Sequence, residues 1–272
     1  MSNINHAALA NSAKPMPTVA PVAWTERHFR LLWGTVGITG CLITWQIGSL
    51  TGLLDPLFVS SPLEVLRTAM RILPTTEFLV HLVSTAQSLF LGLFIAVNIG
   101  VFVGLPIGWL PRLNATFEPV IAAVYGVPYI AFLPVIIMWT GIGMTSRVLI
   151  VFWSAVFPLM INSIQGAREV DDNYLRVGQS FSATNLQMFF TITLPSAVPY
   201  ILAGLRTSIG RAIVGVVVAE FFMSSKGLGY FINLKANALE MAPAFVAIVL
   251  LALFGIALTS IVTYVENRFC NW

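Results

Sequence analysis

The stretch LVSTAQSLFLGLFIAVNIGVFVGLPIGWLP, residues 82–111, decides the fold of this chain because its 30 consecutive positions contain no charged side chain. A helix needs about 20 mostly apolar residues to cross the roughly 30 Å hydrocarbon core of a bilayer. In lipid, every backbone N–H and C=O group must be hydrogen-bonded within the element, which favours a helix over an open strand. The stretch therefore predicts a tilted or extended membrane-spanning helix over roughly residues 82–109.

The rest of the chain has a similar composition. Of the 272 residues, 57% are hydrophobic and 9% are charged, whereas soluble domains contain about 25% charged residues. A water-soluble fold of this size could not cover its surface with so few charges, so the apolar excess must face lipid. The sequence predicts an all-α polytopic membrane protein with about six transmembrane helices. The expected spans are approximately residues 31–51, 82–109, 118–139, 146–166, 195–223 and 243–265.

The distribution of basic residues gives a weak indication of topology. With six spans and the N-terminus inside, seven Lys and Arg residues lie on the cytoplasmic side and five lie outside, which is the expected direction of bias. Both termini are then cytoplasmic. Residues 1–24 do not resemble a cleavable signal peptide. We interpret them as a disordered cytoplasmic tail that precedes a single transmembrane domain, residues 25–272.

Glycines mark one face of the second span. Gly100, Gly104 and Gly108 recur every four residues, so they lie on one side of the helix and allow a neighbouring helix to approach closely.

Prolines and tyrosines mark the third span. The positions are Pro119, Tyr125, Pro128, Tyr129 and Pro134. Proline removes a backbone donor and kinks a helix, and in a membrane such irregularity is best tolerated beside a cavity or another helix. We expect this span to line a cavity; a kink that serves packing alone is the alternative.

A polar segment, residues 165–195, separates the fourth and fifth spans. Asp171 or Asp172 can cap a helix over residues 172–180. A second helix over residues 183–190 carries apolar side chains toward the membrane, and Leu194–Pro195 closes the segment. Two short helices of this kind form a compact lobe whose apolar side chains can enter a groove on a partner.

The end of this segment resembles the integral-membrane permease subunits of ATP-binding-cassette (ABC) importers of the type I fold, and within them the nitrate/sulfonate/taurine group. The family motif reads Glu-Ala-Ala, three residues, Gly, nine residues, Ile-x-Leu-Pro. Its end is matched by Ile192, Leu194 and Pro195. Its Glu, second Ala and Gly are replaced by Arg176, Gly178 and Ser182.

Further similarities to the family follow in the family's order over roughly residues 45–272. They are Ser60 and Pro62, the glycines of residues 84–108, Pro128-x-x-Ala131-x-x-Pro134, Trp139-x-Gly141-Ile142-Gly143, Phe157-Pro158, Gly204-Leu205-Arg206, Ala219-Glu220 and Gly227-Leu228-Gly229-Tyr230. The ordered set is more specific than any one of its members.

The resemblance implies a transport subunit rather than an enzyme. The working unit would contain two copies of this chain, two cytoplasmic ATPase subunits and an extracytoplasmic substrate-binding protein, in a bacterial inner membrane. The chain has no Gly-x-x-x-x-Gly-Lys-Ser/Thr loop to hold phosphate, so ATP and Mg²⁺ would be bound by the partner ATPase. No metal site and no nucleic-acid partner are expected, because the three histidines and the basic residues are scattered.

The resemblance also places the ATPase-docking residues in the polar segment. They are Asp171, Asp172, Leu175, Arg176, Gly178, Gln179, Ser182, Leu186 and Pro195. At Arg176 a base stands where the family has an acid. Either an ATPase partner carries a compensating acid, or Arg176 points into solvent.

Charged residues within the fifth span are the remaining candidates for function. A charge there costs a few kcal/mol unless it is paired or faces water. Arg206 and Glu220 lie near the two ends, where a structural role is favoured. Arg211 lies deeper and either attracts an anionic solute with its fork of donors or pairs with Glu220 of the same or the partner chain. The expected solute path contains Tyr125, Tyr129, Trp139, Arg211 and Glu220.

The sequence thus favours the permease subunit of an ABC importer that moves a small solute, expected to be an anion such as a sulfonate, taurine or nitrate. An ion-coupled secondary transporter is the first alternative, although the spans offer few acids besides Glu220. An intramembrane enzyme is the second, although His-Glu-x-x-His and Gly-x-Ser-x-Gly are both absent. His81 is expected at the membrane interface. A heterodimer with a related chain stays open beside the homodimer.

Overall fold

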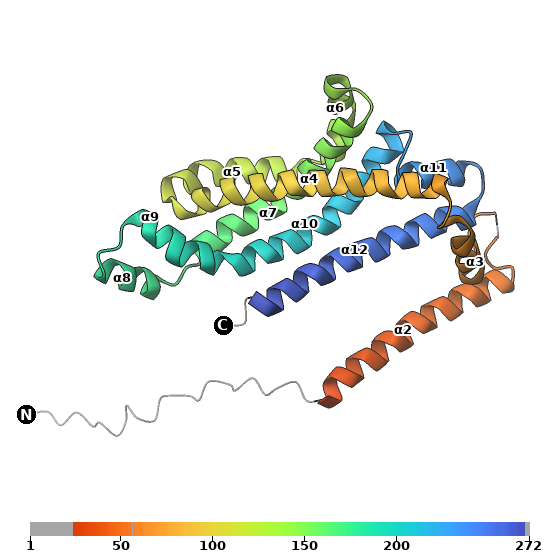
Figure 1. Cartoon of the computed structure of the whole chain (residues 1–272), viewed down its shortest axis with the longest axis horizontal. Coiled ribbons are helices and arrows are strands. Elements are labelled where there is room, and N and C mark those ends of the chain that lie inside the picture. The colour runs from red at the N-terminus through yellow and green to blue at the C-terminus, as the bar shows by residue number, and fades with distance from the viewer. Residues whose placement is uncertain (1–23, 56, 270–272) are drawn as a thin grey trace, which may run out of the picture. The chain divides into compact units, whose positions relative to one another are not determined.

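The computed structural model describes residues 24–55 and 57–269, and within them every regular element is a helix (Figure 1). The α-helices are α2 (Trp24–Leu50), α3 (Pro62–Ile72), α4 (Thr76–Trp109), α5 (Pro111–Gly126), α6 (Leu133–Thr140), α7 (Met144–Arg168), α8 (Asp172–Ser180), α9 (Asn185–Met188), α10 (Leu194–Met223), α11 (Leu228–Asn237) and α12 (Met241–Phe269). A 3-10 turn, η1 (Tyr129–Phe132), precedes α6, and a π turn, η2 (Phe189–Thr193), precedes α10.

The chain divides into two compact units, Met1–Leu53 and Leu54–Trp272. The first unit contains α2, which overlaps the first predicted span, residues 31–51. With 27 residues, α2 rises about 40 Å, which is enough to cross the hydrocarbon core of a bilayer. The predicted disordered tail, residues 1–24, lies outside the described residues except for Trp24, the first residue of α2.

Four helices of the described residues are long and apolar enough to cross a membrane, and a bent pair of helices makes a fifth candidate. They are Thr76–Trp109, Met144–Arg168, Asn185–Met223 and Met241–Arg268, with the pair Pro111–Gly126 and Tyr129–Thr140. The prediction of an all-helical polytopic protein is confirmed. The first expected span, residues 31–51, falls on α2, which is not among the candidates found within the described residues.

Helix α7 packs against α4 and α10 and forms the centre of the second unit. The predicted glycine face of α4 lies against α7. A Cβ atom at Gly100, Gly104 or Gly108 would lie 2.3–2.8 Å from atoms of α7, closer than non-bonded atoms approach. Gly204 and Gly215 of α10 are equally close to α7. The three helices therefore pack backbone against backbone, as small residues allow in membranes.

The predicted third span is not one continuous helix. After α5 the helix axis turns by 79° before η1 and α6 begin. Pro128 lies at the break and has no N–H to donate, and Val127 before it is extended, with φ −78° and ψ 130°. Pro119 lies inside α5, whereas Pro134 occupies the first turn of α6, where proline is tolerated. Of the three prolines expected to break the span, Pro128 marks the break.

Helix α3 begins at a capping serine followed by proline. Ser61 accepts a hydrogen bond from the Glu64 amide at 3.2 Å, and Pro62 is the first helical residue. The side chains of Val65 and Thr68 are buried, whereas Leu66 and Met70 are exposed.

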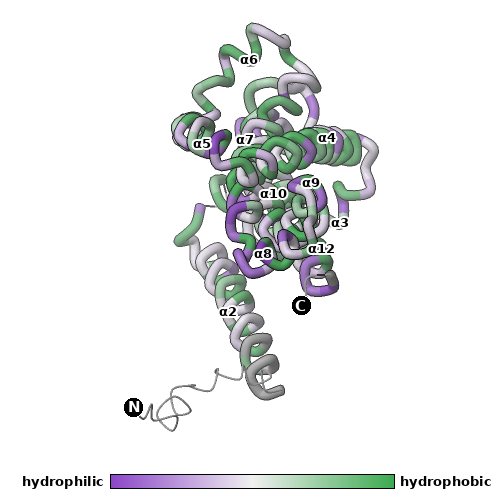
Figure 2. The backbone as a smooth tube through the Cα atoms, turned by 90° about the vertical axis from the view of Figure 1, so that its left-hand side faces the viewer, coloured by the Kyte–Doolittle hydropathy of each residue, from purple (hydrophilic) through white to green (hydrophobic). Residues whose placement is uncertain are grey.

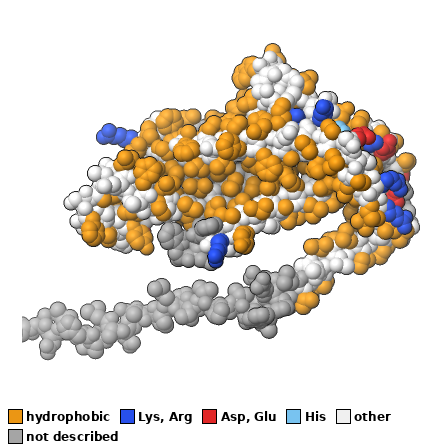
Figure 3. Space-filling view, in the orientation of Figure 1, with side chains coloured by type: hydrophobic (Ala, Val, Ile, Leu, Met, Phe, Trp, Pro, Cys, Tyr) orange, Lys and Arg blue, Asp and Glu red, His pale blue; other side chains and the backbone are white. Residues whose placement is uncertain are grey.

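The second unit has two polar ends and an apolar middle. Helices α3 and α11 lie at one end, and α8 and α9 lie at the other (Figure 1). In the space-filling view, acidic and basic side chains gather at the α3 and α11 end, and most of the face between the ends is hydrophobic (Figure 3). The tube coloured by hydropathy shows α4 as largely hydrophobic and α8 as largely hydrophilic (Figure 2). This distribution suits a protein whose middle lies in lipid.

We predict that Gly108→Ala destabilises the protein. The added Cβ would lie 2.3 Å from the Ile164 carbonyl oxygen, which belongs to a helix backbone and cannot rotate away. Overpacking of this kind costs about 1–3 kcal/mol. Thermal unfolding of the detergent-purified chain should show a lowered midpoint. The matched control is Gly126→Ala, where a Cβ has nothing within 4 Å; equal midpoints for the two variants would contradict the close packing of α4 on α7.

Candidate docking lobe and solute path

The polar segment folds as a two-helix lobe, which we call the α8–α9 lobe (residues 169–193). Asp171 caps α8 by accepting a hydrogen bond from the Asn173 amide at 2.8 Å, as the sequence predicts. Thr184 caps α9 in a reciprocal arrangement with Gln187, whose side chain accepts from the Thr184 amide at 2.8 Å. Local hydrogen bonds from short polar side chains therefore start both helices.

The second half of the lobe differs from the prediction. The expected helix over residues 183–190 is shorter, and it continues through η2 into α10 instead of closing at Leu194–Pro195. Pro195 has no N–H to donate to the preceding turn. The π turn η2 lies just before it and lets the helix continue without that hydrogen bond. The fifth span therefore extends into the lobe as one element, Asn185–Met223.

The predicted docking residues lie mostly on the surface of this lobe. The exposed ones are Asp171, Asp172, Arg176, Gln179, Ser182 and Leu186, and the half-buried ones are Leu175, Gly178 and Pro195. Gly178 faces inward, where a Cβ would lie 3.0 Å from Ile192. Arg176 is exposed, with no ion pair to another described residue.

Large apolar side chains on the lobe are exposed as well. Phe181 is 82% exposed and Leu186 is 68% exposed, and Val177 and Phe190 are also largely uncovered. Leu186 and Phe190 do not pack against another described helix of the chain. Phe189 does so, because its ring lies 5.9 Å from that of Trp109 on α4.

Ser182 occupies the position at which the family motif has glycine, and its backbone explains that preference. Its φ of +55° lies in the left-handed region, which costs a residue with a Cβ about 1–2 kcal/mol. The turn between α8 and α9 thus requires a conformation that glycine adopts freely.

The base of the lobe is tied to neighbouring helices by polar contacts that the sequence did not predict. The Tyr200 hydroxyl of α10 donates to the Glu169 carboxylate, and Gln165 donates to it at 2.8 Å. These two hydrogen bonds, Tyr200 first, lower the pKa of Glu169 because they stabilise its charged form. Arg168 pairs with Glu118 of α5 at 3.1 Å.

Among the predicted path residues, the structure brings Arg211 and Tyr125 together. The Arg211 guanidinium carbon lies 4.8 Å from the centre of the Tyr125 ring, which is cation–π geometry. Arg211 itself is exposed, and Tyr129 is half-buried. Trp139, on α6, is 77% exposed.

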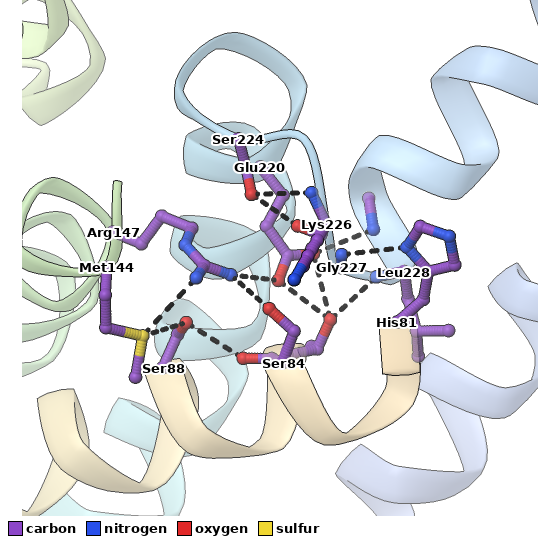
Figure 4. Close-up of polar contacts among 12 residues, drawn as sticks. His81, Ser84, Ser88, Met144, Arg147, Glu220, Ser224, Lys226, Gly227 and Leu228 are labelled. Carbon is purple, nitrogen blue, oxygen red and sulfur yellow. Dashed lines mark hydrogen bonds and ion pairs between the residues drawn. The ribbon is translucent and has the colours of Figure 1, made fainter. Parts of the chain in front are cut away.

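Glu220 belongs to a different site from Arg211. It is completely buried, and its Oε1 lies 3.5 Å from Nη1 of Arg147, which is also buried. Pairing of Arg211 with Glu220 within the chain, one of the two alternatives, is therefore wrong. Arg147 lies in the first turn of α7 and points toward Glu220 (Figure 4).

The buried pair is surrounded by hydrogen-bonding groups from α4 and the start of α11, which we call the Glu220 cluster. Its members are His81, Ser84, Thr85, Arg147, Glu220, Gly227, Leu228 and Gly229. Thr85 Oγ1 lies 2.8 Å from Glu220 Oε1, and the Gly229 amide donates to Oε2 at 2.8 Å. His81 is buried and accepts from the Gly227 amide at 3.1 Å. The sequence signal for this cluster was the pair of charges in apolar surroundings.

The described residues form a polytopic helical membrane protein with a polar two-helix lobe at one end. Residues 96–270 match the family described as binding-protein-dependent transport system inner membrane component. Because this match covers more than half of the chain, the chain belongs to that family, and it is a membrane-spanning permease of the ABC importer class rather than an enzyme.

Three relatives cover most or about two thirds of the chain. It is 29% identical over 245 residues to the taurine transport system permease protein TauC of Escherichia coli (strain K12), covering 88% of this chain and 89% of the relative. It is 26% identical to the formylaminopyrimidine transport permease protein ThiX of Halalkalibacterium halodurans, with 91% and 98% covered. It is 28% identical to the nitrate import permease protein NrtB of Synechocystis sp., with 65% and 64% covered.

Solved structures share the fold at low sequence identity. An amino acid ABC transporter crystallised with histidines matches 74% of this chain and 97% of its own, with a TM-score of 0.60 and 17% identity. A bacterial alginate ABC transporter in complex with a periplasmic protein matches 92% of this chain and 99% of its own, with a TM-score of 0.57 and 14% identity. The fold of the chain is that of ABC importer permeases.

Proposed function

We propose that two copies of this chain form the translocation path of an ABC importer for a small oxyanion such as taurine, another sulfonate or nitrate. Each α8–α9 lobe binds one ATPase subunit in the cytoplasm, and the ATPase subunits hold ATP and Mg²⁺. A binding protein delivers the solute to the opposite, α11 end. Both termini of the chain are then cytoplasmic. The alginate transporter, solved with a periplasmic protein, supports partners of this kind.

The exposed apolar side chains of the lobe carry the docking part of this proposal. Phe181 and Leu186 are exposed, as are Val177 and Phe190, on a lobe that also exposes many polar side chains. Clustered apolar side chains on a polar surface mark interaction sites, and apolar side chains on a helix face suit a groove on a partner. A conformational change in the ATPase would thus act directly on α7 and α10, which enter and leave the lobe.

We predict that Phe181→Ser weakens ATPase binding. Phe181 is 82% exposed, so its removal takes contact area from the docking surface and leaves the fold of the chain unchanged. Tagged chain purified from its host in mild detergent should retain less nucleotide-binding subunit. The matched control is Phe58→Ser, the same change at a 62% exposed position near α3. Equal recovery of the ATPase with both variants would contradict docking on this lobe.

The oxyanion assignment depends on Arg211. Relatives named for taurine and nitrate transport favour an anion, whereas the relative named for a formylaminopyrimidine does not. An exposed guanidinium within a span is costly unless it faces water or an anion. Tyr125 holds the Arg211 side chain by its ring face, which leaves the guanidinium donors free for the oxygens of a sulfonate or nitrate.

We predict that Arg211→Gln lowers taurine uptake by the reconstituted importer at least about tenfold, since a charged hydrogen bond contributes roughly 1.5–3 kcal/mol. The loss should appear in uptake, while the amount of assembled complex stays the same. Arg211→Lys keeps the charge and should retain part of the activity. Unchanged uptake by Arg211→Gln would remove Arg211 from the solute path.

A further inference from the structure

The first amides of α11 are capped by side chains from other helices. Gly227, the residue before α11, has no side chain to cap it. The Gly227 amide donates to His81 Nδ1 at 3.1 Å, and the Leu228 amide donates to Thr85 Oγ1 at 2.7 Å. The Gly229 amide donates to Glu220. Three consecutive donors are therefore satisfied by two residues of α4 and one of α10, so that α11 depends on these helices for its start.

The Glu220 carboxylate fits this position tightly. A negative charge at a helix N-terminus is favoured by the aligned peptide dipoles. A Cβ at Gly227, whose φ is +119°, would lie 2.2 Å from the Glu220 carboxylate, and a Cβ at Gly229 would lie 2.8 Å from the Val217 carbonyl oxygen. The corner between α10 and α11 thus closes around the carboxylate, and loss of this contact would free the corner to move.

Arg147, in contrast, is incompletely bonded. Its Nη1 donates to Ser84 at 2.7 Å and lies 3.5 Å from Glu220, and its Nη2 reaches only the Met144 sulfur at 3.4 Å. Its buried Nε has no hydrogen-bond partner. A buried charge with unused donors is a poor way to stabilise a single structure. It suits a group that changes partners between two arrangements.

The position of the Glu220 cluster connects it to the docking lobe. Arg147 lies in the first turn of α7 and Glu220 in the last turn of α10, and the lobe lies at the other ends of the same two helices (Figure 1). At 1.5 Å per residue, Arg147 lies about 32 Å along α7 from Arg168, where the helix reaches the lobe. A displacement of the lobe therefore acts on Arg147 and Glu220 relative to α4.

We propose that Arg147 and Glu220 form a latch that holds α11 and the corner residues 224–227 in the arrangement described above and opens during each transport cycle. This proposal rests on the proposed function. Glu220 acts as a positioning residue: it contacts no solute and sets the place of α11. ATP binding at the lobe opens the latch by moving α7 and α10. If the latch forms in only one of two states, removing it shifts the population toward the other state.

Labelling of the corner in the whole transporter tests the latch. Ser225 is exposed at the corner, so Ser225→Cys, in a chain with Cys41 and Cys270 replaced by Ala, reports its accessibility. The complex with ATPase and binding protein is placed in nanodiscs and treated with a polar maleimide, nucleotide-free and after trapping with ATP and vanadate. When Glu220 is intact, we expect the labelling rate of Ser225→Cys to differ several-fold between the nucleotide-free and the vanadate-trapped complex. Glu220→Gln should bring the nucleotide-free rate close to the trapped rate.

Two further variants separate a latch from a structural role. Glu240→Gln makes the same chemical change in the pair with Lys235 at the same end of the unit and should keep the difference between states. Thr85→Val leaves both charges in place, removes the hydroxyl that links Glu220 to Leu228, and should change the rate in the same direction as Glu220→Gln. The latch is refuted if Glu220→Gln and Thr85→Val keep the difference in labelling rate between the two states, as Glu240→Gln is expected to do. It is also refuted if the chain with Glu220 and Thr85 intact is labelled at the same rate in both states. A complex that neither hydrolyses ATP nor traps nucleotide would refute the proposed function itself.

Discussion

The close packing of α4 on α7, and of α7 on α10, is the constraint on which the rest of the second unit depends. Lipid supplies no hydrophobic force between helices, so association relies on close van der Waals contact. Glycines on α4 and α10 provide that contact by letting the helix backbones approach across α7. Because the middle of the unit is filled in this way, it offers little space for polar groups, and the buried charges of Arg147 and Glu220 lie near the ends of their helices.

The two polar sites follow from this arrangement. At one end, the chain leaves α7 and returns through α8 and α9 into α10, which presents Phe181 and Leu186 to a partner. At the other end, Arg147 and Glu220 are buried together: Arg147 donates to Ser84 of α4, and Glu220 accepts from Thr85 of α4 and from the Gly229 amide of α11. Since both sites lie on α7 and α10, a rigid pair of helices connects them. The third site, Arg211 with Tyr125, lies between them on the exposed side of α10.

The sequence predicted the elements better than their contacts. Apolar length and helix caps depend on local residues, so the spans, the Asp171 cap and the glycine face of α4 could be read directly. Ion pairs between residues far apart in the sequence could not be predicted. Glu220 pairs with Arg147, 73 positions away in the chain, although Arg211 is closer in sequence. The sequence did not predict that the helix bends by 79° at Pro128 but continues through Pro195. Proline is compatible with either outcome, a break or a π turn. Which of these occurs is decided by tertiary packing.

The measurement that tests the central claim most directly is solute uptake by proteoliposomes that contain either the chain alone or the chain with its co-purified ATPase and binding protein. We expect uptake of taurine or nitrate to require the complete complex, with ATP on the side of the membrane that carries the α8–α9 lobe. We expect no accumulation by the chain alone under any ion gradient. Uptake by the chain alone, driven by a proton or sodium gradient, would contradict the account and identify a secondary transporter.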